Sequence, residues 1–174
     1  MKILVLNGSP RTQGNTAQMV SAFREGARSA GHEVDIVDVC RKHIGGCLAC
    51  EYCHGQGRGQ CVQSDDMTEV YALLREADML VLAAPIYYHG ISGQLKCVID
   101  RFYAVAYPSK PPRLKKIAMF LASGDAAMYD GALFSYQGDF LDYLGLTDMG
   151  VYTVHGGVGP KKLAELRSFG ASLK

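Results

Sequence analysis

Six cysteines are the residues of this chain with the most obvious chemistry, and four of them lie close together. These four are Cys47, Cys50, Cys53 and Cys61, spaced as Cys-x2-Cys-x2-Cys-x7-Cys. Thiolates at such short gaps can converge on one metal centre, and sets of four cysteines hold iron–sulfur clusters or zinc. The spacing leaves three alternatives open: a [4Fe–4S] cluster, a zinc ion, or free thiols in an ordered structural or redox loop.

A second chemical pattern follows the first apolar run of the chain, in the segment 7–16. The segment combines hydroxyl groups, one cation and two glycines: Ser9, Thr12 and Thr16, Arg11, Gly8 and Gly14. It then opens a helix, whose free N–H groups and positive dipole end favour an anion. We therefore predict a phosphate-binding loop, although a well-capped strand–helix turn would use the same residue types. Neither the ATP-binding G-x-x-x-x-G-K-[ST] motif nor the dinucleotide fingerprint G-x-G-x-x-G is present.

Two further loops follow the apolar runs 77–84 and 116–122. Ligands of a doubly wound sheet bind beyond the carboxyl ends of its strands, so both loops are candidates for a ligand site. The first loop begins at Pro85, which we expect to end its strand because proline cannot donate to a ladder. It offers apolar and aromatic surface and a permissive glycine: Ile86, Tyr87, Tyr88 and Gly90. The second loop contains Ser123 and Gly124.

The elements that position these loops alternate along the chain, as apolar runs typical of buried parallel strands and as amphipathic helical segments. Strands are predicted at 2–7, 33–39, 77–84, 116–122 and 147–154, and helices at 15–30, 67–76, 92–103, 128–144 and 160–168. This alternation predicts an α/β three-layer sandwich with right-handed crossovers, in one domain spanning residues 1–174. The cysteine-rich segment 40–66 has neither period and is expected to be an insertion loop.

Composition excludes several classes of function. The formal charge is +1, from 18 basic and 17 acidic side chains, without the basic stripe of a nucleic-acid binder. No segment approaches the roughly 18 apolar residues that span a bilayer, so we expect no membrane partner. The N-terminal apolar run breaks at Asn7-Gly8, too early for a signal peptide. We therefore expect a cytoplasmic protein, in which disulfides are rare.

Two motifs carry a resemblance to a known family. The run Gly-Ser-Pro-Arg-x-x-Gly-Asn-Thr at residues 8–16 resembles the FMN phosphate loop of the NAD(P)H-dependent FMN reductase family, within the flavodoxin-like superfamily. Residues 84–101, which begin Ala-Pro-Ile-Tyr and end Asp-Arg, resemble the segment after the third strand of that family. The resemblance extends over essentially the whole chain. It implies a flavodoxin-like five-stranded parallel sheet of order 2-1-3-4-5.

Carried over by position, the resemblance implies an FMN site assembled from three loops. The phosphate would be held by Ser9, Arg11, Gly14, Asn15 and Thr16. The isoalloxazine ring would contact the loop after the third strand, namely Pro85, Ile86, Tyr87, Tyr88 and Gly90, and its pyrimidine edge would meet Ser123 and Gly124. The redox chemistry belongs to the flavin, so we assign no catalytic acid or base.

The function implied by this resemblance is an oxidoreductase that takes electrons from NAD(P)H through FMN to a quinone, a flavin, a nitro-compound or another small acceptor. The resemblance also implies a homodimer. An alternative comes from the cysteine loop, which resembles that of the iron–sulfur flavoproteins, a sister family in which a [4Fe–4S] cluster passes electrons to FMN. The chain would then exchange electrons with a redox protein. Cluster-free relatives carry a similar loop, so its cysteines are also compatible with free thiols.

A receiver domain shares the flavodoxin-like fold but is excluded by its residues. Such a domain needs an acidic pocket after the first strand and an aspartate at the end of the third. This chain has Asn7-Gly8-Ser9 and Ala83-Ala84-Pro85 at those places.

Overall fold

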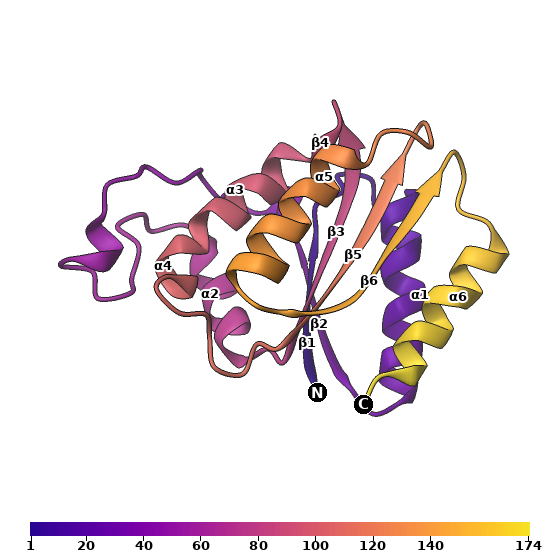
Figure 1. The fold of residues 1–174 in the computed structure, drawn as a ribbon, viewed down its shortest axis with the longest axis horizontal. Helices are drawn as coiled ribbons and strands as arrows, with labels where there is room; N and C mark the ends of the chain where they lie inside the picture. The colour runs from indigo at the N-terminus through magenta and orange to yellow at the C-terminus, as the bar shows by residue number, and fades with distance from the viewer.

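The computed structural model describes residues 1–174 and places a parallel sheet between two layers of helices (Figure 1). The long strands are β1 (Lys2–Asn7), β2 (Glu33–Asp38), β3 (Met79–Tyr87), β5 (Lys116–Ser123) and β6 (Thr147–His155). Their spatial order is β2-β1-β3-β5-β6, and all four neighbouring pairs are parallel. Counted among themselves, the five strands have the predicted order 2-1-3-4-5. A two-residue strand that was not predicted, β4 (Gly90–Ile91), pairs antiparallel with the end of β3.

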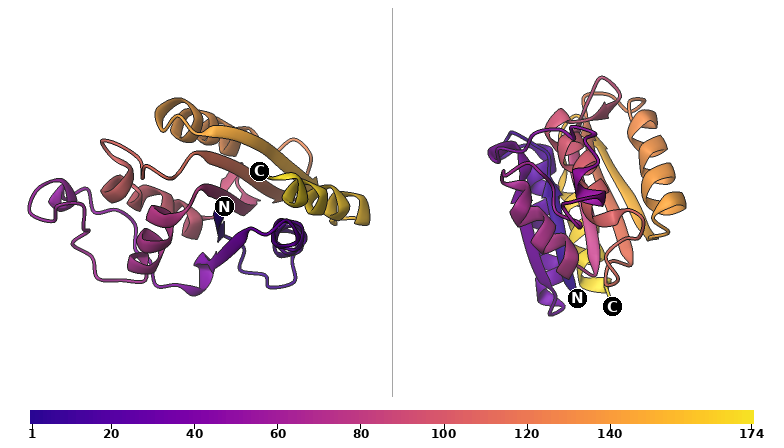
Figure 2. Two further views of the ribbon diagram at one scale, coloured as in Figure 1. Left: turned by 90° about the horizontal axis from the view of Figure 1, so that it is seen from below. Right: turned by 90° about the vertical axis from the view of Figure 1, so that its left-hand side faces the viewer.

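The helices cover both faces of this sheet, as the two turned views in Figure 2 show. They are α1 (Asn15–Ser29), α2 (Met67–Glu76), α3 (Gly93–Arg101), α4 (Tyr103–Ala106), α5 (Asp130–Ser135) and α6 (Pro160–Ser172). Helices α1 and α6 pack side by side on one face and share one apolar core with it. The side chains of α2, α3, α4 and α5 form a second core on the other face.

Alternation of side chains along the central strands explains why the two cores can form. In β1, Leu4 and Leu6 belong to the core under α2, α3 and α5, whereas Ile3 and Val5 belong to the core under α1 and α6. Successive residues of a strand point to opposite faces, and here both faces are buried. This double burial is why the strand segments are apolar throughout rather than alternating in polarity.

The prediction that Pro85 ends its strand is wrong. Pro85 pairs in register with Ala122 of β5, and β3 continues to Tyr87 before turning back as β4. The reason is the direction in which Pro85 faces. The carbonyl of Ala83 accepts a hydrogen bond from Gly8 N at 2.7 Å, on the β1 side of the strand. Pro85, two residues on, faces the same side beyond the end of β1, so its missing N–H costs no ladder bond.

Two predicted helices differ from the structure. The segment predicted as one helix over 128–144 is α5 followed by a wide π-helical turn over Tyr136–Tyr143, and the segment predicted over 92–103 is divided into α3 and α4. Gly138, a poor helix former, lies in the π-helical turn. Cys97 is half-buried on α3.

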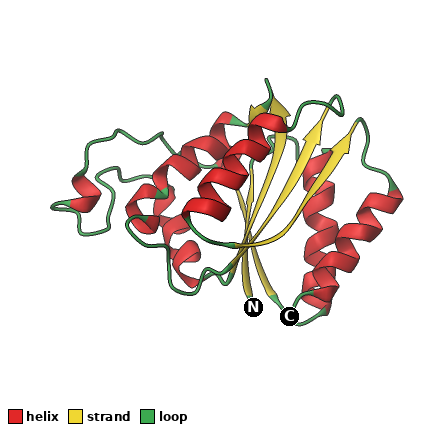
Figure 3. Cartoon of the chain, in the orientation of Figure 1, coloured by secondary structure: helices red, strands yellow, loops and turns green.

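The segment between β2 and α2 extends away from the sheet as a long irregular loop, drawn in Figure 3 as loop interrupted by a short helical turn. Its only regular pieces are single 3-10 turns at Val39–Arg41 and Tyr52–His54. The predicted cysteine-rich loop therefore has the expected place and irregularity. No helix of the structure is long and apolar enough to cross a membrane.

Candidate functional site

A cavity of about 230 Å³ opens at the carboxyl ends of the central strands, where the last residues of β3 meet the loops after β1, β5 and β6. Ten of the twelve predicted cofactor-binding residues line it: Ser9, Arg11, Gly14, Asn15, Thr16, Pro85, Ile86, Tyr87, Ser123 and Gly124. Ala122 and Gly156 complete the lining. Tyr88 and Gly90 do not line this cavity. The two loops that the sequence motifs singled out thus converge on one site.

The start of α1 presents free hydrogen-bond donors to this cavity. No side chain caps the helix at Gly14, and the backbone N–H groups of Asn15 and Thr16 make no hydrogen bond within the chain. The guanidinium of Arg11 makes no hydrogen bond or ion pair, and its stem lies beside Gly14, with Arg11 Cβ 3.0 Å from where a Cβ on Gly14 would be. An uncapped helix N-terminus beside an unpaired cation fits a phosphate group.

The shape of the phosphate-binding loop is set by a buried asparagine that the sequence reasoning did not assign to the site. Asn7 Oδ1 accepts a hydrogen bond from Ser9 N at 3.1 Å, and Asn7 Nδ2 donates to Asp38 at 2.8 Å. The hydroxyl of Ser9 then accepts from Arg11 N at 3.2 Å. These bonds connect the end of β2 to the loop after β1. The available signal was a polar residue at the end of an otherwise apolar strand.

The side chain of Asn15 is committed to another loop. Its Nδ2 donates to Gly156 O, and its Oδ1 accepts from Val158 N at 3.0 Å. The turn between β6 and α6 is thereby fixed against the start of α1. Gly156 has φ of +67°, a left-handed conformation that glycine adopts without strain. The backbone N–H of Asn15 therefore remains available to a ligand, whereas its side chain does not.

A buried tyrosine holds the loop after β5. Ser123 Oγ lies 2.8 Å from the hydroxyl of Tyr129, which donates to Val154 O of β6 at 2.7 Å. Both side chains are buried, so Ser123 reaches the cavity as part of this network, whereas Gly124 is exposed at the rim. Sequence reasoning missed Tyr129, since nothing in a lone tyrosine after a strand indicates which carbonyl it will reach.

The loop after β3 is a hairpin whose tip stands outside the cavity. Ile86 pairs with Ile91 and Tyr87 with Gly90, which leaves Tyr88 and His89 as a two-residue turn. Tyr87 is 47% exposed and lines the cavity, whereas Tyr88 is 99% exposed and points away from the protein. Of the two tyrosines, the structure therefore places only Tyr87 in the lining of the cavity.

The cysteine loop is closed at its neck by one buried arginine. Arg101, whose side chain is 1% exposed, donates to both carboxylate oxygens of Asp65 at 2.8 and 3.1 Å and to Gly45 O at 2.9 Å. Burial disfavours the charged carboxylate of Asp65, but the bonds from Arg101 and from two backbone N–H groups lower its pKa below the ordinary value. Burial also raises the pKa of the neighbouring Tyr71 hydroxyl to about 12. Asp65 further accepts from Met67 N at 3.1 Å, which satisfies one donor at the start of α2.

The four clustered cysteines are not gathered around a common centre. Cys47 and Cys50 are exposed, Cys53 and Cys61 are half-buried, and no three metal-binding side chains of the chain form a site. Burial raises the pKa of the Cys53 thiol, and the neighbouring Cys61 raises it further. In this arrangement the cysteines do not fit a cluster or a zinc ion. None of the six cysteines forms a disulfide, and the loop is fixed at its neck.

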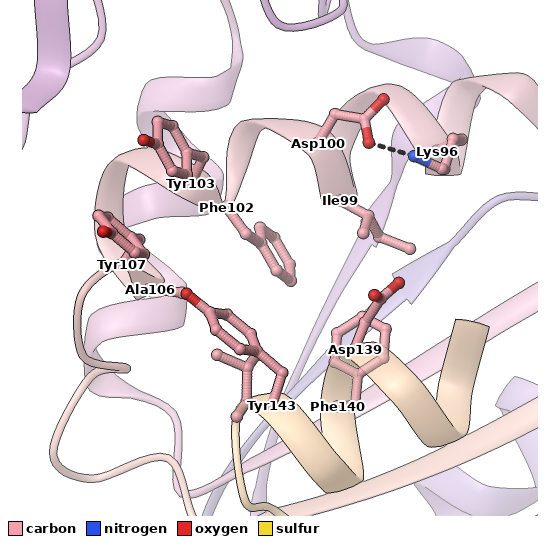
Figure 4. Close-up of a pocket in the computed structure, with 11 residues that line it drawn as sticks. Lys96, Ile99, Asp100, Phe102, Tyr103, Ala106, Tyr107, Asp139, Phe140 and Tyr143 are labelled. Carbon is pink, nitrogen blue, oxygen red and sulfur yellow. Dashed lines mark hydrogen bonds and ion pairs between the residues drawn. The ribbon is translucent and has the colours of Figure 1, made fainter. Parts of the chain in front are cut away.

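A second cavity, of about 260 Å³, lies between α3–α4 and the π-helical turn (Figure 4). Its lining is largely aromatic and apolar, and Lys96 and Asp100 form an ion pair at its rim. The tip of the cysteine loop reaches this region, because His54 stacks edge-on against Tyr103 and Tyr107. None of the predicted cofactor-binding residues lines this cavity.

Comparison with known proteins identifies the family. The family model described as NADPH-dependent FMN reductase matches residues 1–158. The chain belongs to this family. Membership of this family confirms the predicted use of FMN and NAD(P)H and the prediction of an FMN-dependent oxidoreductase. In fold, the chain is similar to an NAD(P)H:quinone oxidoreductase from Methanothermobacter marburgensis, with a TM-score of 0.77 at 21% identity over 98% of this chain and 94% of that one. This likeness confirms the predicted fold.

Relatives in sequence are named iron–sulfur flavoproteins. One from Archaeoglobus fulgidus is 32% identical over 170 residues, which cover 95% of this chain and 73% of that protein. One from Methanosarcina thermophila is 39% identical over 101 residues, 58% of this chain and 52% of its own length. Other relatives of the same name are matched over between 48% and 62% of their length, so the chain spans about half to two thirds of most of them.

Proposed function

We propose that this chain holds FMN at the cavity between the loop after β1 and the end of β3, and that it passes electrons from NAD(P)H to a small acceptor such as a quinone. One observation carries the proposal: an uncapped helix N-terminus with the unpaired Arg11 and a hairpin wall containing Tyr87 line the same cavity. Bound FMN would supply the hydride and electron chemistry. The acceptor class is taken from the quinone oxidoreductase that shares the fold.

The residues of the chain would bind and orient the cofactor. Arg11 and the N–H groups of Asn15 and Thr16 would donate to the phosphate, and charge-assisted bonds of this kind are the stronger ones. Ile86 and Tyr87 would lie along the ring, and the exposed backbone at Gly124 would face its polar edge. A site that grips both ends of FMN favours the mononucleotide over riboflavin, which has no phosphate.

Equilibrium titration with FMN and riboflavin tests this proposal. Arg11→Ala should weaken FMN by about 1.5–3 kcal/mol, the usual size for a hydrogen bond to a charged group, and leave riboflavin unchanged. Arg24→Ala is the matched control, because Arg24 lies on α1 without lining the cavity. A parent protein that binds riboflavin as tightly as FMN would refute the phosphate site. Quinone reduction by NADH and by NADPH then identifies the donor and tests the acceptor class.

A second function, electron transfer through FMN and a [4Fe–4S] cluster, is favoured by the relatives that are named iron–sulfur flavoproteins and by the cysteine spacing. The separated thiols argue against it, since a cluster would require the loop tip to rearrange above its fixed neck. Anaerobic reconstitution with iron and sulfide decides between the two. About four irons per chain, lost in Cys50→Ser while FMN affinity is kept, would establish the cluster site. Four thiols that remain open to alkylation after reconstitution would exclude it.

We also infer a cytoplasmic homodimer, from the family resemblance, from the unpaired cysteines and from exposed apolar side chains. All six cysteines are unpaired thiols. Large apolar side chains are exposed on and beside the π-helical turn, with Phe134 82% and Tyr143 62% exposed. Light scattering should give twice the mass of the chain, and Tyr143→Glu should reduce it toward the monomer. A monomeric parent protein would contradict the dimer, and recovery of the protein in the membrane or exported fraction would contradict the location.

A further inference from the structure

The turn at the tip of the β3–β4 hairpin is strained. Both of its residues have left-handed backbone, with φ of 49° at Tyr88 and 64° at His89. Positive φ at both central residues is the type I′ pattern, which normally takes Asn-Gly. Side chains with a Cβ are disfavoured there, and such strain persists only where the surroundings hold the backbone in place. Something outside the hairpin must therefore hold this tip.

The contact that holds it is Gly131, in the first turn of α5. A Cβ built on Gly131 would lie 2.5 Å from His89 O and 3.4 Å from its carbonyl carbon. The carbonyl of His89 thus rests directly on the α-carbon of the glycine, and any side chain at position 131 would push it away. No other residue type permits this approach without movement of one of the two backbones.

The hairpin that rests on Gly131 is also the wall of the cofactor cavity. Pro85, Ile86 and Tyr87 line the cavity, and Tyr87 and Ile86 pair with Gly90 and Ile91 on the returning strand. Because the hairpin is only two pairs long, displacement of its tip moves the wall. The three atoms nearest an added Cβ on Gly131 all belong to His89 and none to the phosphate-binding loop after β1, so that loop should stay in place.

We propose that Gly131 is the positioning residue of the ring-binding hairpin, and that its missing side chain sets how the wall at Tyr87 lies against the flavin ring. The inference rests on the proposed function, since it concerns the same cavity. To bring the added Cβ from 2.5 Å to the 3.4 Å of ordinary contact, His89 must move by about 0.9 Å. A misplacement of about 1 Å can lower a rate by on the order of a hundredfold.

The test compares Gly131→Ala with Gly138→Ala. Gly138 lies in the helical turn that follows α5 and has no atom within 4 Å of an added Cβ, so it controls for the effect of alanine on helix stability. In Gly131→Ala, the affinities for FMN and for riboflavin should fall by the same factor, so that their ratio stays at the parental value. Reduction of the bound flavin by NAD(P)H should slow by on the order of a hundredfold. Hydrogen exchange of the flavin-free protein should rise at residues 86–91 only.

The outcomes separate this inference from the proposed function. A parent protein that binds riboflavin as well as FMN refutes the proposed function before the variant is made. A parent that prefers FMN, with a Gly131→Ala variant that matches Gly138→Ala in both flavin affinities and in hydrogen exchange, refutes the positioning role alone. A Gly131→Ala protein that does not fold would also overturn it, because the inference requires the exposed tip to yield instead.

Discussion

The structure gives the clearest expectation for a change in folding stability when the Arg101 side chain is removed. In Arg101→Met, the methionine fills part of the space and carries no donor. Asp65, with a side chain 16% exposed, would lose two charge-assisted bonds of 2.8 and 3.1 Å, and the carbonyl of Gly45 would lose a third of 2.9 Å. A nearly buried carboxylate would then stand without its cation.

Breaking a buried ion pair by removing one partner costs about 3–5 kcal/mol. For a domain of this size, 1 kcal/mol shifts Tm by about 2–4 °C, so Tm should fall by roughly 6–20 °C. The exposed pair of Arg113 and Asp78, at 3.0 Å with side chains 49% and 26% exposed, is the internal control. Solvent weakens such a pair, and Arg113→Met should cost no more than about 1 kcal/mol.

Urea unfolding gives the free energy of unfolding of both variants. It can be followed by far-ultraviolet circular dichroism, since the chain has no tryptophan for fluorescence. Arg101→Lys should recover only part of the loss, since an ammonium cannot bridge both carboxylate oxygens as the guanidinium fork does. Equal free energies of unfolding for Arg101→Met and Arg113→Met would refute the reasoning. FMN affinity should be little changed, because Arg101 does not line the cofactor cavity.

The loss of stability in Arg101→Met should depend on pH, because it depends on the charge of Asp65. The pKa is lower in the folded protein than in the unfolded chain, so the contribution of the pair is present above the unfolded value. It is lost as pH falls through the folded value, where the carboxylate becomes protonated and no longer needs its cation. The difference in stability between the parent and Arg101→Met should therefore narrow below about pH 4.

Three further predictions follow from other contacts. Asn15→Ala should increase hydrogen exchange in the β6–α6 turn, because both ends of its amide hold that turn; unchanged exchange there would contradict the assignment. Gly8→Ala should destabilise the protein by about 1–3 kcal/mol in thermal unfolding, because the new Cβ would lie 2.6 Å from the buried Ser92 Oγ, and Gly8→Ala in a Ser92→Ala background should cost less. Alkylation of the native protein, followed by mass spectrometry, should modify Cys50 before Cys53, whose pKa burial raises; equal rates would contradict this order.

The fold and the phosphate loop could be predicted from the sequence because both depend on local pattern. Strands β1 and β2 and helices α1 and α2 agree with the predicted boundaries to within a residue. Burial of both sheet faces makes the central strands β1, β3 and β5 almost continuously apolar, and the residues around Arg11 are close in sequence as well as in space. The π-helical turn could not be predicted, because 3.6-residue periodicity does not distinguish a wide turn from a regular helix.

The residues that the sequence did not assign act through partners far along the chain. Asn7 and Asp38 are 31 positions apart, and Arg101 and Asp65 are 36 apart. Asp65 combines a local contact with distant ones. It accepts a hydrogen bond from Met67 N at the start of α2, while most of its hydrogen bonds belong to the neck of the cysteine loop.

The two ends of the proposed flavin site are thus built in different ways. The phosphate end is specified by consecutive residues, so a substitution such as Arg11→Ala should change the preference for FMN over riboflavin. The ring end is a short hairpin whose position depends on Gly131, more than forty residues after its tip at His89. Substitutions in the hairpin or at Gly131 should leave the preference for FMN over riboflavin intact and lower the affinity for both flavins together. The affinity ratio of the two flavins is therefore a measurement that assigns any substitution near the cavity to one end or the other.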